Sequence, residues 1–227
     1  MRWMHFVFLI VFFLSADSLH GQRGKRRFDT FAGGVVTGMN IAQLDGDYFT
    51  GFDKAGLYAG LRGNARFSSR LSLNIDLLFS QKGSKIPHGT YVTDNEIRDR
   101  TINLNYVEVP ILFKINLKPV VNSPFLEFGG SFSQLISTRI KEKEPGVFRG
   151  TAFKEIAEDF RSFDYNVIAG LGFNAGERLE FAFRYSFGVN KFYINEAFVP
   201  RVAFSPLPKE VEFLRNYYIS LLAAYTL

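Results

Sequence analysis

Few residues of this chain combine the type and the spacing that catalysis requires. His88 lies in a predicted loop near Ser84 and Thr90, and histidine is the usual general base of hydrolytic sites. No carboxylate at a recognisable spacing completes a Ser-His-Asp arrangement around it. We therefore expect no catalytic residue and predict that the protein is not an enzyme.

Thiol and metal chemistry have equally little support. The chain has no cysteine, which excludes disulfides, thiol nucleophiles and thiolate metal sites. Asp45, Asp47 and Asp53 share a short polar stretch, yet this stretch lacks the glycine position and the terminal glutamate of an EF-hand loop. We interpret it as a glycine-assisted turn and expect no metal and no cofactor.

Charged residues instead alternate with apolar ones. In residues 54–67, one side of an extended strand carries Ala55, Leu57, Ala59, Leu61, Ala65 and Phe67, and the other carries Lys54, Tyr58, Arg62, Asn64 and Arg66. Residues 71–79, 163–175, 179–189 and 217–227 repeat this period of two. Such charges would be hard to bury in an apolar core, so the pattern is typical of a strand between lipid and a polar interior.

The elements that would position these residues are eight strands, each long enough to cross a bilayer. We predict them at 29–41, 54–67, 71–82, 102–116, 124–137, 163–175, 179–191 and 214–227. The fold class is therefore all-β: an eight-stranded antiparallel up-and-down transmembrane β-barrel. In the fourth strand the apolar phase changes between Leu104 and Val107, next to Pro110, which predicts a β-bulge near 105–107.

The connections alternate in length. Segments 42–53, 83–101, 138–162 and 192–213 are long, whereas 68–70, 117–123 and 176–178 are short. Outer-membrane barrels have short periplasmic turns and longer extracellular loops. This orientation places both termini in the periplasm.

The interior of such a barrel would receive charges of both signs in equal number. These are Lys54, Arg62, Arg66, Asp76, Glu108, Lys114, Glu127, Asp164, Glu180 and Arg184. Opposite charges in a narrow, low-dielectric space should pair, and the interior of eight strands is filled by side chains. We expect a structural ion-pair network rather than a wide pore.

The N-terminus has the features of a secretory signal peptide. Arg2 precedes an apolar run at 6–14, and Ser15, Ala16 and Ser18 follow; the run is too short for a membrane helix. We assign 1–21 to the signal peptide, 22–28 to a basic periplasmic leader and 29–227 to the barrel. The net charge of +5 is mild, and the basic leader has no interleaved aromatic residues, so we expect no nucleic-acid partner.

Two long loops offer partner surfaces. Segment 192–213 combines prolines with the aromatic residues Phe192, Tyr193, Phe198 and Phe204, a combination that would suit a protein contact. Segment 138–162 mixes both charge signs and includes a possible short helix at 151–160. Its length would allow contact with lipopolysaccharide phosphates or a protein, and we expect the barrel itself to be a monomer.

Several stretches resemble the PorT-like outer-membrane β-barrel proteins of the Bacteroidetes type. They are GVVTGMN at 34–40 with Asp45-Gly-Asp47 after it, LLFSQKGS at 77–84, NYVEVPILFK at 105–114 and FLEFGG at 125–130. The resemblance implies an outer-membrane barrel and, for the founding members, a role in gliding and type IX protein secretion.

The sequence thus predicts a bacterial outer-membrane protein with a structural, adhesive or secretion-accessory role exerted through its loops. A narrow small-solute channel is one alternative. A soluble periplasmic ligand-binding barrel, with its apolar faces turned inward, is another.

Overall fold

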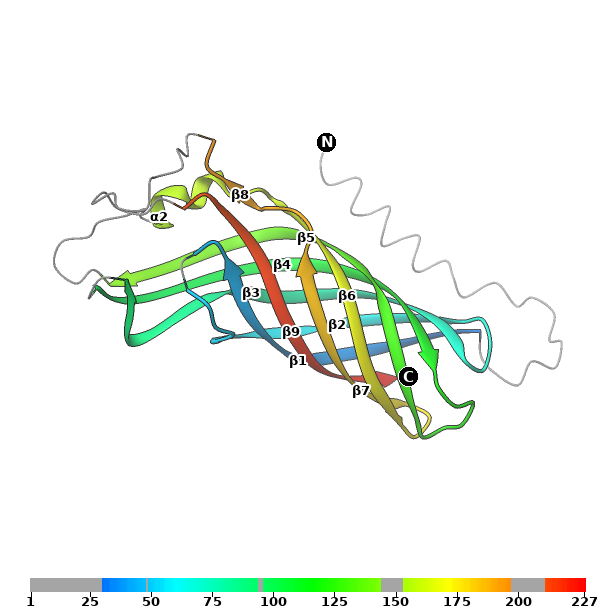
Figure 1. Cartoon of the computed structure of the whole chain (residues 1–227). Helices are drawn as coiled ribbons and strands as arrows, with labels where there is room; N and C mark the ends of the chain where they lie inside the picture. Colours follow the sequence, from blue (N-terminus) through cyan, green and yellow to red (C-terminus); the bar gives the residue numbers. More distant parts are fainter. Residues whose placement is uncertain (1–29, 48, 94–95, 144–152, 197–210) are drawn as a thin grey trace, which may run out of the picture.

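Eight antiparallel strands close into a barrel (Figure 1). The structure is a computed structural model that describes residues 30–47, 49–93, 96–143, 153–196 and 211–227. The order around the ring is β1-β2-β3-β4-β5-β6-β7-β9, and β1 pairs with β9 to close it. The predicted all-β, up-and-down barrel is confirmed. The predicted signal peptide and basic leader lie outside the described residues.

The strands match the predicted segments, but β3, β4 and β5 are longer than predicted. Their bounds are β1 Phe31–Asp45, β2 Lys54–Arg66, β3 Leu71–Thr93, β4 Glu96–Asn116, β5 Ser123–Lys143, β6 Phe163–Ala175, β7 Leu179–Gly188 and β9 Phe213–Thr226. A two-residue strand, β8 (Tyr193–Ile194), pairs with the start of β9. A single helical turn, α2 (Phe153–Ile156), continues as the 3₁₀ turn η2 (Ala157–Asp159). No helix in the described segments is long and apolar enough to cross a membrane.

One end of the barrel has short turns, and the other has long and partly ordered connections. At the short end, Gly176 takes a φ of 83° between β6 and β7, a conformation that favours glycine. At the long end, segments expected to be loops are strand instead, because β3 and β4 stay paired from Leu71↔Ile115 to Thr93↔Glu96. Figure 1 shows β3, β4 and β5 extending past their neighbours on the side that carries α2.

An apolar band surrounds the barrel. Leu57, Leu77, Phe128, Leu171 and Leu221 are between 42% and 58% exposed on the outer face. On β6 the outward rings of Phe163 and Phe173 lie ten residues apart; at ~3.4 Å per residue and a tilt of ~40°, this span is about 26 Å high, the height of a membrane-facing band.

The predicted bulge is real, but it lies on the neighbouring strand. Asn105 pairs with Ser137 and Tyr106 pairs with Leu135, so the extra residue is Ile136 of β5. The inward phase of β4 does not change: Ile102 and Leu104 point inward, as do Tyr106, Glu108 and Pro110. The apolar pattern changes phase along the sequence because the inward residues Ile102 and Leu104 are themselves apolar and belong to a buried apolar cluster.

Pro110 sits in the middle of β4 at a gap in the ladder. Pairing with β3 runs to Ile75↔Ile111 and resumes at Leu78↔Glu108 in the same register. A proline nitrogen cannot donate a hydrogen bond, which accounts for the interrupted ladder. Pro110 therefore interrupts the pairing without displacing the strands.

Candidate functional site

The interior is a column of buried polar side chains, and it is the most unusual part of the molecule. Inward positions alternate with the apolar outer ones on each ring strand. Two inward glycines on β6 make room for large neighbours: a Cβ on Gly172 would lie 2.3 Å from the Phe125 ring, and one on Gly170 would lie 2.9 Å from Glu127. Small residues on β6 thus lie beside large residues on β5, so that the bulky side chains fit inside the barrel.

Arg184 is the centre of the first network, in the half of the barrel near the short turns. Its guanidinium donates to both carboxylate oxygens of Glu127, at 2.6 and 3.0 Å. It also donates to Asp76 at 3.1 Å and to the Tyr58 hydroxyl at 2.8 Å. Both carboxylates and the arginine are fully buried, so each charge depends on the others for its solvation.

Arg62 and Lys114 extend the same network. Arg62 forms a two-pronged contact with Asp76 at 2.7 and 2.9 Å and reaches Glu180 at 3.0 Å. Lys114 donates to Glu180 and, at 2.7 Å, to the Asn174 side chain. Three cations and three carboxylates therefore balance.

A second network surrounds Lys82, closer to the long loops. Its ammonium group lies 3.2 Å from Glu108 and 3.5 Å from Asp164. It is also 4.2 Å from the ring centre of Tyr218 and 4.8 Å from that of Tyr106, distances at which a cation is attracted by the ring face. Lys82 is fully buried.

Neutral donors add hydrogen bonds to both carboxylates, whereas Asp164 Oδ1 is buried without a hydrogen-bond partner among the described residues. The Tyr218 hydroxyl and the Ser131 hydroxyl donate to Glu108, at 2.5 and 2.7 Å. The Asn216 and Asn166 amides donate to Asp164 at 3.0 and 3.3 Å. The arrangement holds the Lys82, Glu108 and Asp164 charges in contact with one another.

An ion pair between a loop and the extended wall closes the long end. Arg100 of β4 contacts the Asp47 carboxylate at 3.2 Å and its backbone carbonyl at 2.9 Å, and the Ser84 hydroxyl donates to the same carboxylate at 2.5 Å. Burial raises the pKa of Asp47, and Arg100 and Ser84 oppose that rise. The first loop is thereby tied to β3 and β4.

Above Lys82 the interior becomes an apolar plug. We use this name for the buried cluster Leu44, Ile102, Leu104, Tyr106, Phe153, Phe160, Phe192, Tyr193, Val211 and Leu214. The rings of Phe160 and Phe192 meet edge to face at 5.2 Å between centres, and the Arg100 guanidinium stacks on Phe153 at 3.7 Å. The described residues Phe153 and Phe160 after β5, and Phe192 and Tyr193 after β7, therefore pack with inward side chains of the wall at this end.

The structure places most of the predicted interior charges within these networks. Asp76, Glu108, Lys114, Glu127, Asp164, Glu180, Arg62 and Arg184 all take part. Lys54 is buried and donates to the Ala55 carbonyl at 2.5 Å, and Arg66 is half-buried at the end of β2.

The proposed aromatic contact surface needs correction. Phe192 and Tyr193 are 0% and 5% exposed because they belong to the plug, so these two rings are not available to a partner. Phe198 and Phe204, and the side chain of His88, lie outside the part of the chain that the structure describes.

Lys82, Asp47 and Arg100 are interior charges that sequence reasoning missed. Lys82 is the last residue of the predicted strand 71–82, and it continues the inward series Asp76, Leu78 and Ser80. Extending that even-numbered phase by one step would have found it. Asp47 and Arg100 gave no such signal, because their proximity depends on how the first loop packs on the wall.

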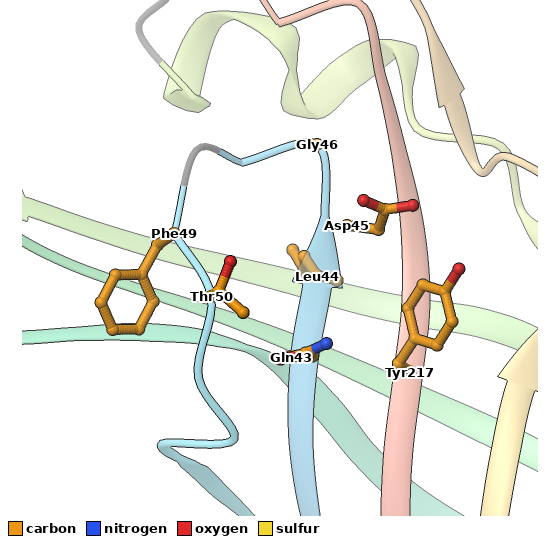
Figure 2. Close-up of a pocket in the computed structure, with 7 residues that line it drawn as sticks. All are labelled: Gln43, Leu44, Asp45, Gly46, Phe49, Thr50 and Tyr217. Atoms are coloured by element: carbon orange, nitrogen blue, oxygen red, sulfur yellow. The ribbon is translucent and has the colours of Figure 1, made fainter. Parts of the chain in front are cut away.

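A hollow lies near the rim, between the end of β1, the loop that follows and β9. Figure 2 shows its lining: Gln43, Leu44, Asp45, Gly46, Phe49, Thr50 and Tyr217. The Asp45 carboxylate accepts a hydrogen bond from Arg215 at 2.8 Å, and Gln43 accepts one from the backbone of Gly51 at 3.2 Å. These polar groups are used to hold the rim together.

The chain was compared with models of known protein families. The family described as "Outer membrane protein beta-barrel domain" matches residues 21–193, which is more than half of the chain. No curated protein sequence matches.

Several solved structures are similar to this chain at low sequence identity. Ail, the attachment invasion locus protein of Yersinia pestis, is 11% identical, with a TM-score of 0.44 over 88% of this chain and 100% of Ail. OprG of Pseudomonas aeruginosa is 9% identical, with a TM-score of 0.39 over 87% and 94% of the two chains. Neisserial surface protein A is 11% identical, with a TM-score of 0.39 over 87% and 97%.

Proposed function

Because the chain belongs to the outer membrane β-barrel protein family, we propose that it is a closed, non-enzymatic barrel that acts through its long-loop end. Its role would be structural, adhesive or accessory to secretion. The observation that carries the proposal is the apolar plug, whose Phe153, Phe192, Ile102 and Leu104 are each at most 1% exposed above two ion-pair networks. An interior filled in this way favours a role at the surface over transport through the lumen.

The long-loop end faces the outside of the cell in this proposal, and both termini face the periplasm. The short turns and the C-terminal end of β9 lie together at the opposite end, as expected for the periplasmic side. The cysteine-free chain allows a direct test. A cysteine at exposed Glu158 in η2 should react with a membrane-impermeant maleimide on intact cells, whereas one at exposed Glu177 should react only after lysis. The reverse pattern would overturn this orientation.

A narrow channel is the competing function, and the polar character of the lumen below the plug favours it. If the barrel conducts, planar-bilayer recordings should show a current whose ion selectivity changes when Arg62 or Glu180 is reversed in charge. We expect no such current, because these side chains are held in the Arg62–Glu180 pair at 3.0 Å.

The soluble periplasmic alternative requires apolar faces inside and polar faces outside. The observed faces are the reverse: Arg184 and Lys82 are buried, whereas Phe31 and Leu171 are 77% and 58% exposed. Fractionation with gels of boiled and unboiled samples would test the membrane assignment directly.

The more specific proposal is a PorT-like role in type IX secretion, supported by the motifs at 77–84 and 105–114. Both motifs contribute interior residues of the second network, Lys82 and Glu108, and thus have a structural role. Deletion of the gene should reduce export of type IX cargo. Normal export in the deletion strain would leave the barrel assignment standing and remove the secretion role.

A further inference from the structure

The outer face of the extended β3–β5 wall carries a basic patch immediately beyond the apolar band. The band ends at the outward pair Phe79 and Val107. Beyond it, the outward positions with described side chains are Gln81, Gly83, Lys85, Thr101, Asn103, Asn105, Ser137, Arg139 and Lys141. This set contains three cations and no carboxylate.

Strand pairing fixes how the three cations lie relative to one another. Thr101 pairs with Lys85 on one side and with Lys141 on the other. The two lysines are therefore two strand spacings apart, about 10 Å. Arg139 pairs with Asn103 in the next row toward the membrane, so the exposed groups form a compact triangle.

The height of this triangle suits the headgroup region. Lys85 lies six residues beyond Phe79, which at ~3.4 Å per residue and ~40° of tilt is about 16 Å above the band. Asn103, level with Arg139, lies four residues beyond Val107 and is about 10 Å above it by the same measure. Flexible basic side chains also reach down toward an interface while their stems cover apolar surface.

Below the triangle, the outer surface changes from polar to apolar in one step. The row Gln81, Asn105 and Ser137 is linked by side-chain hydrogen bonds of 2.9 and 2.8 Å. The next outward groups are Phe79, Val107 and Ile136, and Ile136 is 54% exposed at the bulge. A molecule with phosphates above acyl chains would meet cations and apolar side chains in the matching order.

We propose that this patch, Lys85, Arg139 and Lys141, binds the phosphate groups of outer-leaflet lipopolysaccharide, with its acyl chains against Phe79, Val107 and Ile136. The proposal rests on the outward orientation of the long-loop end proposed above. A row of surface cations is ordinarily only solvated. Here the outward positions whose side chains are described contain no carboxylate, and the patch adjoins the lipid boundary, so a phosphorylated lipid is its complementary partner.

Binding of lipid A to the purified barrel in detergent tests this proposal, with native mass spectrometry as the readout. Wild-type protein should bind bisphosphorylated lipid A at least tenfold more tightly than dephosphorylated lipid A. The triple variant K85Q/R139Q/K141Q should lose about tenfold in affinity for the bisphosphorylated form. Raising salt should weaken wild-type binding, because exposed charges are screened.

The matched control is R70Q/K118Q/R178Q, which removes the same charge from exposed positions near the short turns. It should bind within twofold of wild type, and a heat-dependent gel shift verifies that both variants are folded. Equal binding of the two lipid forms, or wild-type affinity in the K85Q/R139Q/K141Q variant, would overturn the proposal. Orientation does not enter a detergent assay, so this outcome is independent of the cysteine-labelling result.

Discussion

At the scale of single residues, Arg184 is the side chain on which the interior depends most. It holds Glu127 and Asp76 while being 1% exposed. Replacing it with leucine should cost about 3–5 kcal/mol, because two buried carboxylates lose their partner. Urea unfolding of the barrel from lipid vesicles measures this loss.

The double variant R184L/E127L separates charge from packing. It removes one of the stranded carboxylates, so it should be more stable than R184L alone. A double variant that is less stable than R184L would show that the loss comes from side-chain volume rather than from unpaired charge.

The hydroxyl of Tyr218 gives a smaller and cleaner test. It donates to the buried Glu108 carboxylate at 2.5 Å, and a hydrogen bond to a charged group contributes about 1.5–3 kcal/mol. Tyr218→Phe should reduce the free energy of unfolding by that amount. Tyr225→Phe, on the outer face, is the matched control and should change it by less than about 0.5 kcal/mol.

Asp47 should make stability depend on pH in a defined direction. Its folded-state pKa is raised above the ordinary value of 3.8, so the folded protein takes up a proton at a higher pH than the unfolded chain does. This group therefore adds stability as the pH falls through the window between the raised pKa and 3.8. As the pH falls through that window, the free energy of unfolding of wild type should rise relative to that of Asp47→Asn, as measured by urea unfolding at several pH values. A relative decrease would contradict the raised pKa of Asp47.

At the scale of elements, the plug attaches the segment after β5 to the barrel wall. Phe153 of this segment is almost fully buried in the plug, together with Phe192, which follows β7. Lys154 and Arg161 of the segment after β5 are exposed. Phe192→Ala removes packing that usually contributes about 3–5 kcal/mol in a core. Trypsin should then cut at Lys154 and Arg161 faster, while the heat-dependent gel shift persists. Phe181→Ala, on the outer face, should leave the cleavage rate unchanged.

The elements also show how far the sequence can be interpreted. Period-two alternation predicted the ring strands and most of the interior charges, because lipid and lumen impose opposite demands on adjacent positions. It failed at Ile102 and Leu104, where the interior is apolar and the two faces no longer differ in polarity. Phe192 was missed for a related reason: burial by a returning loop depends on contacts distant in sequence, which leave no local period.

At the scale of the whole molecule, the outward apolar band implies that the outer face of the barrel meets lipid. A charged residue placed on that face should therefore be costly in a membrane and nearly neutral in water. Val167 lies near the middle of the β6 span between Phe163 and Phe173 and is 55% exposed. Val189 follows β7 beside Tyr165, one outward position inside the Phe163 end of the band, and is 57% exposed. The two valines therefore have the same exposure and differ in depth.

An arginine at each valine turns this difference into a measurement of the membrane. Val167→Arg should destabilise the folded barrel in vesicles by about 2–4 kcal/mol, whereas Val189→Arg should cost less, because the penalty falls toward the interface. Equilibrium unfolding in vesicles gives both values. If the outer face met water, an exposed arginine would be nearly neutral at either position, so equal and small effects would contradict the membrane-spanning arrangement itself.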